Sequence, residues 1–196
     1  MRTNTNCAFL LALVMSFIPF TAHGDGDVSF APADSVSTPR GSSVPVWKLV
    51  AGDWTTAEAR ASALYWQSRF PRATVASPAT YKYNCHSYAW YQQSPSNPYW
   101  MGLTNPADED AYWTDGSYYL VASGDARSGS LPAGVRTGDK VSYVNSEHSA
   151  VVHYFGAFIS KWAQGPVMIH LPQDCPYVTD PLVCPWCTNP INFYRR

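Results

Sequence analysis

The sequence contains few charged residues and no run of basic ones. Lysine and arginine together number 13, aspartate and glutamate number 14, and the formal net charge is −1. Proteins that bind nucleic acid usually gather lysine and arginine on one face to contact the phosphates. The composition therefore argues against a nucleic-acid partner and indicates a compact domain with a polar, mostly uncharged surface.

Long apolar runs are also absent, apart from AFLLALVMSFIPF near the N-terminus. This run is shorter than the roughly 20 apolar residues that a membrane-spanning helix needs. Arg2 precedes it, and the small residues Ala22 and Gly24 follow it, which is typical of a secretory signal peptide over residues 1–24. We expect a secreted or periplasmic mature chain that does not span a membrane; a retained anchor is the alternative.

The chain after residue 24 divides by composition into three parts. Residues 25–45 are rich in Ser, Pro, Asp and Gly and predict a flexible lead-in. Residues 46–172 have the length and apolar content of one domain, without internal repeats. Residues 173–196 are rich in Pro and Cys and predict a tail that wraps the surface.

Two helices are expected in the central part. Thr55 and Glu58 form a capping-box pattern that begins a scaffold helix, and Pro71 ends it. A second helix is expected from Asn84 to about Gln93. After it, residues 97–119 predict a long ordered loop with one or two short strands, whose aromatic residues either pack on the core or stack on sugars or peptides.

From Gly138 the sequence changes to short runs of β-branched and aromatic residues separated by turn residues. The runs KVSYVN, SAVVHYF, AFISKWA and PVMIHL predict an antiparallel meander of four to five strands. Helices followed by such a meander indicate an α+β fold, in which the second helix packs on a small antiparallel sheet.

Four cysteines remain in the predicted mature chain, and export favours disulfides among them. Cys175, Cys184 and Cys187 lie close together and are the disulfide candidates, with CPWC more typical of a clamp on the tail than of a redox or metal site. Cys85 stands alone. It is either a reactive thiol or a member of a second disulfide.

Cys85 lies in YNCHSYAW, where the second helix is expected to begin. A helix N-terminus favours the thiolate, which is the nucleophilic form, and the backbone N–H groups there can face an oxyanion. Asn84 is a candidate helix cap. Tyr81 and Tyr83 precede the thiol, so their phenol groups are candidate donors to a substrate or an oxyanion.

His148 follows a turn and opens a strand, which makes it the candidate general base. His170 ends a later strand and is the candidate that orients the His148 ring by a hydrogen bond. Both histidines also have ordinary structural explanations. Of the rival histidines, His86 is expected to point away from Cys85 on the helix, and His153 to project to the opposite face of its strand from His148.

Two polar residues between the candidate histidines, Lys161 and Gln164, are candidate third members of the site or substrate contacts. A zinc site made of Cys85, His148 and His170 is an alternative to this thiol site, but no ligands are paired at H-x-x-x-H spacing. The G-x-S-x-G, phosphate-loop and dinucleotide patterns are absent too. We expect neither a metal nor another cofactor.

At these residues the chain resembles the NlpC/P60 and CHAP group of cysteine amidohydrolases and peptidases. That group has a Cys at the start of a helix, a Gly-Asp turn before a strand, a His at the start of the next strand and a polar residue on the strand after it. Here these are Cys85, Gly138–Asp139, His148 and His170. SKWAQG resembles an S-K-W-G run of some members, with Ala163 in place of the glycine.

The resemblance covers residues 80–172 and implies a papain-like fold and thiol-dependent hydrolysis of amide bonds. The expected substrate is the peptide stem of peptidoglycan or another peptide. The alternatives are a non-catalytic module on the same fold that binds glycan or peptide, and a papain-like acyltransferase or thioesterase. The same hydrolysis can also serve a toxin or effector. The sequence does not indicate an oligomeric state.

Overall fold

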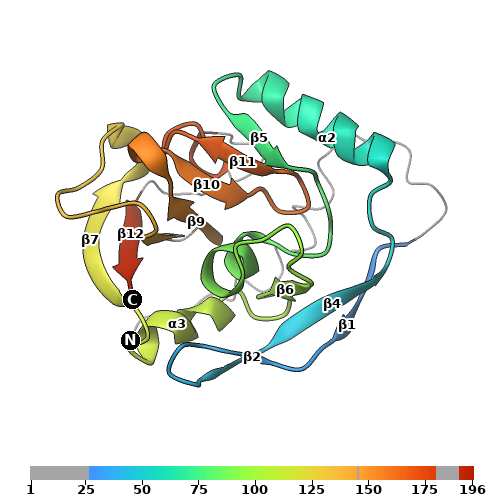
Figure 1. The fold of residues 1–196 in the computed structure, drawn as a ribbon, viewed down its shortest axis with the longest axis horizontal. Helices are drawn as coiled ribbons and strands as arrows, with labels where there is room; N and C mark the ends of the chain where they lie inside the picture. Colours follow the sequence, from blue (N-terminus) through green and yellow to red (C-terminus); the bar gives the residue numbers. More distant parts are fainter. Residues whose placement is uncertain (1–26, 145, 180–189) are drawn as a thin grey trace, which may run out of the picture.

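The largest element of the fold is an antiparallel sheet of seven strands, seen in Figure 1. The computed structural model describes residues 27–144, 146–179 and 190–196. Across the sheet the strands follow the order β5-β11-β10-β9-β8-β12-β7. Their bounds are β5 (Thr74–Ser77), β7 (Tyr119–Asp125), β8 (Lys140–Tyr143), β9 (His148–Val152), β10 (Phe158–Lys161), β11 (Val167–His170) and β12 (Pro190–Arg195).

The meander predicted from Gly138 is confirmed as β8 to β11, which are neighbours in sequence order and pair antiparallel. The sheet is larger than predicted because β5 pairs with β11 at one side, whereas β12 and β7 extend it beyond β8. The α+β class is also confirmed, with strands predominating. A turn with Gly138 at φ 92° leads into β8.

Residues 190–196, the last part of the predicted tail, do not wrap the surface as predicted. They form β12, which lies between β8 and β7. Ile191 and Phe193 are 2% and 0% exposed, with the half-buried Asn192 between them. This alternation is typical of a strand, but the preceding Pro and Cys residues obscured it in the sequence. The folded domain therefore does not end at residue 172.

The predicted lead-in is also part of the fold. It contains β1 (Ser29–Pro32), β2 (Val36–Ser37) and β3 (Ser43–Val44). Strand β1 pairs with β4 (Val46–Ala51), which pairs with β6 (Tyr99–Met101) in a three-stranded sheet. The prediction of a flexible segment was wrong. It relied on the Ser and Pro content and overlooked two valines, Val36 and Val44, that are buried in the core.

Among the helices, α2 (Thr56–Arg69) is the scaffold helix predicted from its capping box. The Thr55 side chain accepts from the Glu58 N–H, and the Glu58 carboxylate accepts from the Thr55 N–H. Its Trp66 packs edge-on against Trp162. The other helical segments are the π-helix η1 (Ser87–Tyr91), the 3-10 helices η2 (Asp108–Asp110), η3 (Ala126–Ser128) and η4 (Tyr154–Gly156), and the short helices α3 (Ala111–Thr114) and α4 (Pro176–Thr179).

The large sheet is covered on both faces, because adjacent residues of one strand lie in different hydrophobic clusters. Val152 and Phe158 belong to the cluster that includes Trp66 of α2. Val151 and Ile159 belong to the other cluster, together with the aromatic residues of η1 and the loop after it. Side chains alternate between the faces of a strand, so each cluster is the core of one face. The segment that carries Cys85 therefore packs on the Val151 face.

Some predictions fall outside the described residues. These are the signal peptide over residues 1–24 and the disulfide candidates Cys184 and Cys187. Within the described ranges, none of the helices has the length and apolar character needed to cross a membrane.

Candidate thiol site

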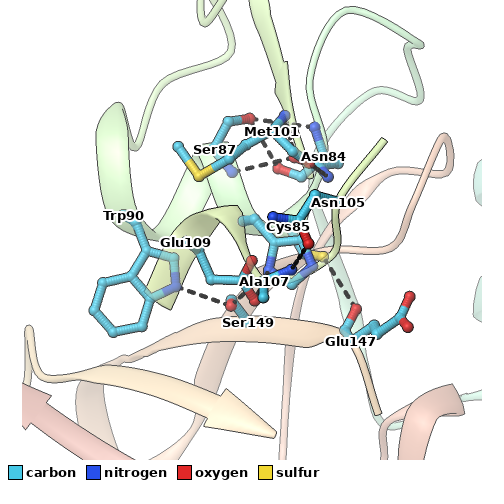
Figure 2. A network of polar contacts seen from close by, with 11 residues as sticks. Asn84, Cys85, Ser87, Trp90, Met101, Asn105, Ala107, Glu109, Glu147 and Ser149 are labelled. Atoms are coloured by element: carbon cyan, nitrogen blue, oxygen red, sulfur yellow. Dashed lines mark hydrogen bonds and ion pairs between the residues drawn. The ribbon is translucent and has the colours of Figure 1, made fainter. Parts of the chain in front are cut away.

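Cys85 begins a short helical segment, residues 85–91, that continues as the π-helix η1. The Asn84 side chain accepts a hydrogen bond from the Ser87 N–H at 3.1 Å and donates to the Met101 carbonyl at 2.6 Å, as Figure 2 shows. Asn84 therefore acts as the predicted cap and also ties the helix to β6. The segment ends earlier than predicted, where the Gln92 N–H bonds to the Ser87 carbonyl.

Lys161 fastens the chain that leads to Cys85. Its side chain is fully buried, and its ammonium group donates to the carbonyls of Thr80 at 2.9 Å, Ala163 at 2.6 Å and Gly165 at 2.5 Å. These three acceptors match the three N–H donors of an ammonium group. Burial lowers the pKa of Lys161 to about 7. The residue predicted as a substrate contact is thus a structural clamp.

Tyr83 and Gln164 contribute to the same clamp. The Lys161 ammonium lies 5.2 Å from the centre of the Tyr83 ring, and Tyr83 is 0% exposed. Burial raises the pKa of the Tyr83 phenol. The backbone carbonyl of Gln164 accepts hydrogen bonds from the Thr80 N–H at 3.2 Å and from the Trp54 indole N–H at 3.0 Å. These contacts hold the approach to Cys85 in place.

Cys85 carries a free thiol that is buried beside the turn between β8 and β9. Its Sγ lies 3.9 Å from the carbonyl oxygen of Glu147, the residue directly before His148 (Figure 2). Glu147 has a left-handed backbone with φ 44°, which is uncommon outside glycine. The structure therefore brings the candidate nucleophile to the turn that leads into the candidate base.

His148 is buried on the face of β9 opposite to its neighbour Ser149. Its ring stacks on Tyr177, with 3.9 Å between centroids, and also packs against Tyr143. Neither ring nitrogen has a hydrogen-bond partner in the described part of the chain. Burial lowers the pKa of His148 well below its usual value, and the charges of His170 and His86 lower it further. The ring is therefore neutral, and both of its nitrogens are buried without a hydrogen-bond partner among the described residues.

His170 does not orient His148 as predicted, because both of its ring nitrogens bond elsewhere. Nδ1 lies 2.8 Å from the Leu171 carbonyl, which only accepts, so Nδ1 carries the proton. Nε2 then accepts from the Ser160 hydroxyl at 2.9 Å, and that oxygen accepts from the Trp162 indole at 3.0 Å. Burial lowers the pKa of His170 to about 4. These hydrogen bonds fix His170 as a neutral ring.

The prediction that His86 points away from Cys85 is wrong. Burial lowers the pKa of His86, but the charge and a side-chain hydrogen bond of Cys85, with a contribution from Glu147, raise it above its usual value. Its Nδ1 lies 3.0 Å from Glu109 Oε1 and 3.0 Å from Ser149 Oγ, and these partners turn the ring. Sequence reasoning missed Glu109 as well, although an acidic run inside an aromatic loop was a signal for it.

The predicted disulfides are not tested by these contacts. Cys175 is buried, and burial raises the pKa of its thiol to about 12. Its two candidate partners lie outside the described residues, so the pairing stays a prediction. Within residues 27–144, 146–179 and 190–196, no three His, Cys, Asp or Glu side chains are grouped as metal ligands would be.

Comparison with known proteins finds no match at a significant level among family models, curated proteins or solved structures. The resemblance to the NlpC/P60 and CHAP group therefore stays a prediction. A functional proposal for this chain depends on the chemistry of its own residues.

Proposed function

We propose that the protein is a secreted or periplasmic thiol hydrolase that cleaves amide bonds and has a papain-like arrangement of helix and sheet. The observation that carries the proposal is the placement of the Cys85 thiol. It lies within reach of the His86 imidazole and against the turn that leads into His148. A cysteine becomes nucleophilic as its thiolate, and a neighbouring imidazole favours that form.

In the proposed reaction the Cys85 proton moves to His148, and Sγ attacks the carbonyl carbon of the amide. The protonated His148 then donates to the leaving nitrogen as the carbon–nitrogen bond breaks, which leaves a thioester on Cys85. Water, deprotonated by His148, hydrolyses the thioester and releases the acid. The role of His148 is the one that the sequence resemblance implies. Its nitrogens have no hydrogen-bond partner among the described residues, and catalytic hydrogen bonds often tighten only when substrate binds.

The proposed substrate is the peptide stem of peptidoglycan, the substrate class that the sequence resemblance implies. The binding-module alternative relied on exposed aromatic residues in the loop over residues 97–119. Several of them face the core instead: Tyr112 and Trp100 are 1% and 6% exposed, and Trp113 stacks on Tyr194 at 4.9 Å. The packing of this loop favours the hydrolase over a module that binds through it.

The test is incubation of the protein with purified peptidoglycan, followed by mass spectrometry of the soluble fragments. We expect fragments from the wild type, none from Cys85→Ala, and a loss of at least about 100-fold for His148→Asn. His153→Asn is the matched control, because it makes the same substitution next to β9 and away from the thiol. We expect this control to retain full activity.

Equal release by wild type and Cys85→Ala would refute a cysteine nucleophile. Binding of peptidoglycan without release, by a folded wild-type protein, would favour the binding module. Hydrolysis of a thioester substrate but not of peptidoglycan would favour the acyltransferase or thioesterase alternative.

A further inference from the structure

A second buried acid–base pair, His86 and Glu109, lies next to Cys85. His86 Nδ1 and Glu109 Oε1 are 3.0 Å apart, and the two side chains are 6% and 7% exposed. Ser149 Oγ contacts the same nitrogen at 3.0 Å and accepts from the Trp90 indole at 2.9 Å. Figure 2 shows the Glu109 carboxyl group beside the Ser149 hydroxyl. Both contacts are made by His86 Nδ1. The other ring nitrogen of His86, Nε2, does not take part in them.

Negative groups surround this ring from three elements. The helix η2 contributes Glu109 and its two neighbours, the turn before β9 contributes Glu147, and Cys85 precedes the ring in its own helical segment. The charge of His86 in turn lowers the pKa of Asp108 and Asp110, against the effect of their burial. The cation that opposes it is a protonated His148, whose pKa His86 lowers. The balance of charge favours the imidazolium form of His86.

Glu109 and His86 have a physical reason to be ionised together. Burial raises the pKa of Glu109, because an isolated carboxylate is poorly solvated there. A buried charge becomes tolerable when an opposite charge contacts it with good hydrogen-bond geometry. An imidazolium at His86, with Nδ1 at 3.0 Å from Glu109 Oε1, is an opposite charge in such contact.

We propose that Glu109 is a positioning residue that holds His86 as an imidazolium beside Cys85 and thereby favours the Cys85 thiolate. The inference rests on the proposed function of Cys85 as nucleophile and adds a fixed charge to that site. The thiol proton still moves to His148, and His86 keeps its proton throughout the reaction. The same positive charge makes protonated His148 a stronger acid toward the leaving amine.

The test measures the rate of Cys85 alkylation by iodoacetamide as a function of pH in the full chain. Peptide mapping by mass spectrometry separates Cys85 from the other cysteines. Glu109→Gln keeps the shape of the side chain and removes its charge, so we expect the midpoint of the alkylation profile to rise by about one pH unit. Glu109→Asp should restore part of that shift.

Asp110→Asn is the matched control, because it removes a charge from the adjacent residue without a contact to the His86 ring. Its shift should be less than half of that for Glu109→Gln. His86→Gln provides a second variant in case the first folds poorly, and it should raise the midpoint as well. Since Glu109 acts through His86, adding Glu109→Gln to His86→Gln should produce no further shift.

An unchanged or lowered midpoint in folded Glu109→Gln would overturn the inference, and so would a double variant in which the two shifts add. These outcomes are distinguishable from failure of the proposed function. That failure is judged by fragment release from wild type and Cys85→Ala, whereas the alkylation profile needs no substrate.

Discussion

Lys161 donates a hydrogen bond to the backbone carbonyl of Ala163, which has a left-handed backbone with φ 49°. This turn is formed by the SKWAQG run. A left-handed conformation crowds the Cβ atom of any residue other than glycine. The clamp that holds the approach to Cys85 therefore contains a strained residue.

Ala163→Gly should raise the free energy of unfolding by about 1 kcal/mol, because glycine adopts the left-handed conformation without that crowding. Urea denaturation of both proteins measures the change. Ala157→Gly is the matched control, since Ala157 has φ −70° and glycine should destabilise the protein there. Stabilisation by both substitutions, or by neither, would contradict the strain argument.

Lys161→Met should lower the free energy of unfolding by roughly 3 kcal/mol. The substitution keeps an unbranched side chain of nearly the same length but leaves one buried and two partly buried carbonyl groups without their donor. Lys82→Met is the control, because Lys82 is exposed and its ion pair with Asp53 spans 3.7 Å. We expect less than about 1 kcal/mol for it. Equal effects in the two denaturation curves would argue against a clamp.

Local and periodic signals predicted much of this fold. The capping box of Thr55 and Glu58 begins α2, and the spacing of β-branched runs yields β8 to β11. Signals of composition failed, because Pro and Ser content says little about a segment that is buried by partners distant in sequence. Residues 36 and 44 bury their valines in this way, and β12 pairs with two strands that lie far from it in the sequence.

The candidate site shows the same limit. The sequence order singled out Cys85 and His148, and the structure brings the thiol to the turn before that histidine. Helical geometry alone predicted that His86 points away from Cys85. In the structure, Glu109 and Ser149, which lie far from it in the sequence, hold its ring instead. The role predicted for His170 failed for a similar reason, since Ser160 and Leu171 satisfy both of its nitrogens.

Phe193→Ala should lower the free energy of unfolding by about 4 kcal/mol, because it leaves a cavity at a fully buried position of β12. A tail that merely wraps the surface would lose far less. Asn192→Ala is the control on the same strand, where the partly exposed side chain bonds to Ser123. We expect about 1 kcal/mol or less for it. A small loss for Phe193→Ala in urea denaturation would contradict the placement of β12.

The neutral ring of His170 should make the protein less stable in acid. In the unfolded chain a histidine has a pKa of about 6.5, whereas burial lowers the pKa of His170 to about 4 in the folded protein. Between these two pH values the unfolded state binds more protons than the folded state. The stability that neutral His170 contributes to the folded protein is therefore fully present above about pH 6.5 and is lost as the pH falls toward 4. The expected slope is about 1.4 kcal/mol per pH unit.

Protonation of Nε2 would also remove the acceptor for the Ser160 hydroxyl, which is why the structure keeps this ring neutral. His170→Asn eliminates the titrating group, so its free energy of unfolding should fall less steeply between pH 6.5 and 4 than that of the wild type. Urea denaturation at several pH values measures both slopes. The variant is expected to be less stable at neutral pH, and the slope is therefore the quantity to compare. Parallel curves for the two proteins would show that His170 is protonated in the folded state and that its hydrogen bonds do not fix the neutral ring.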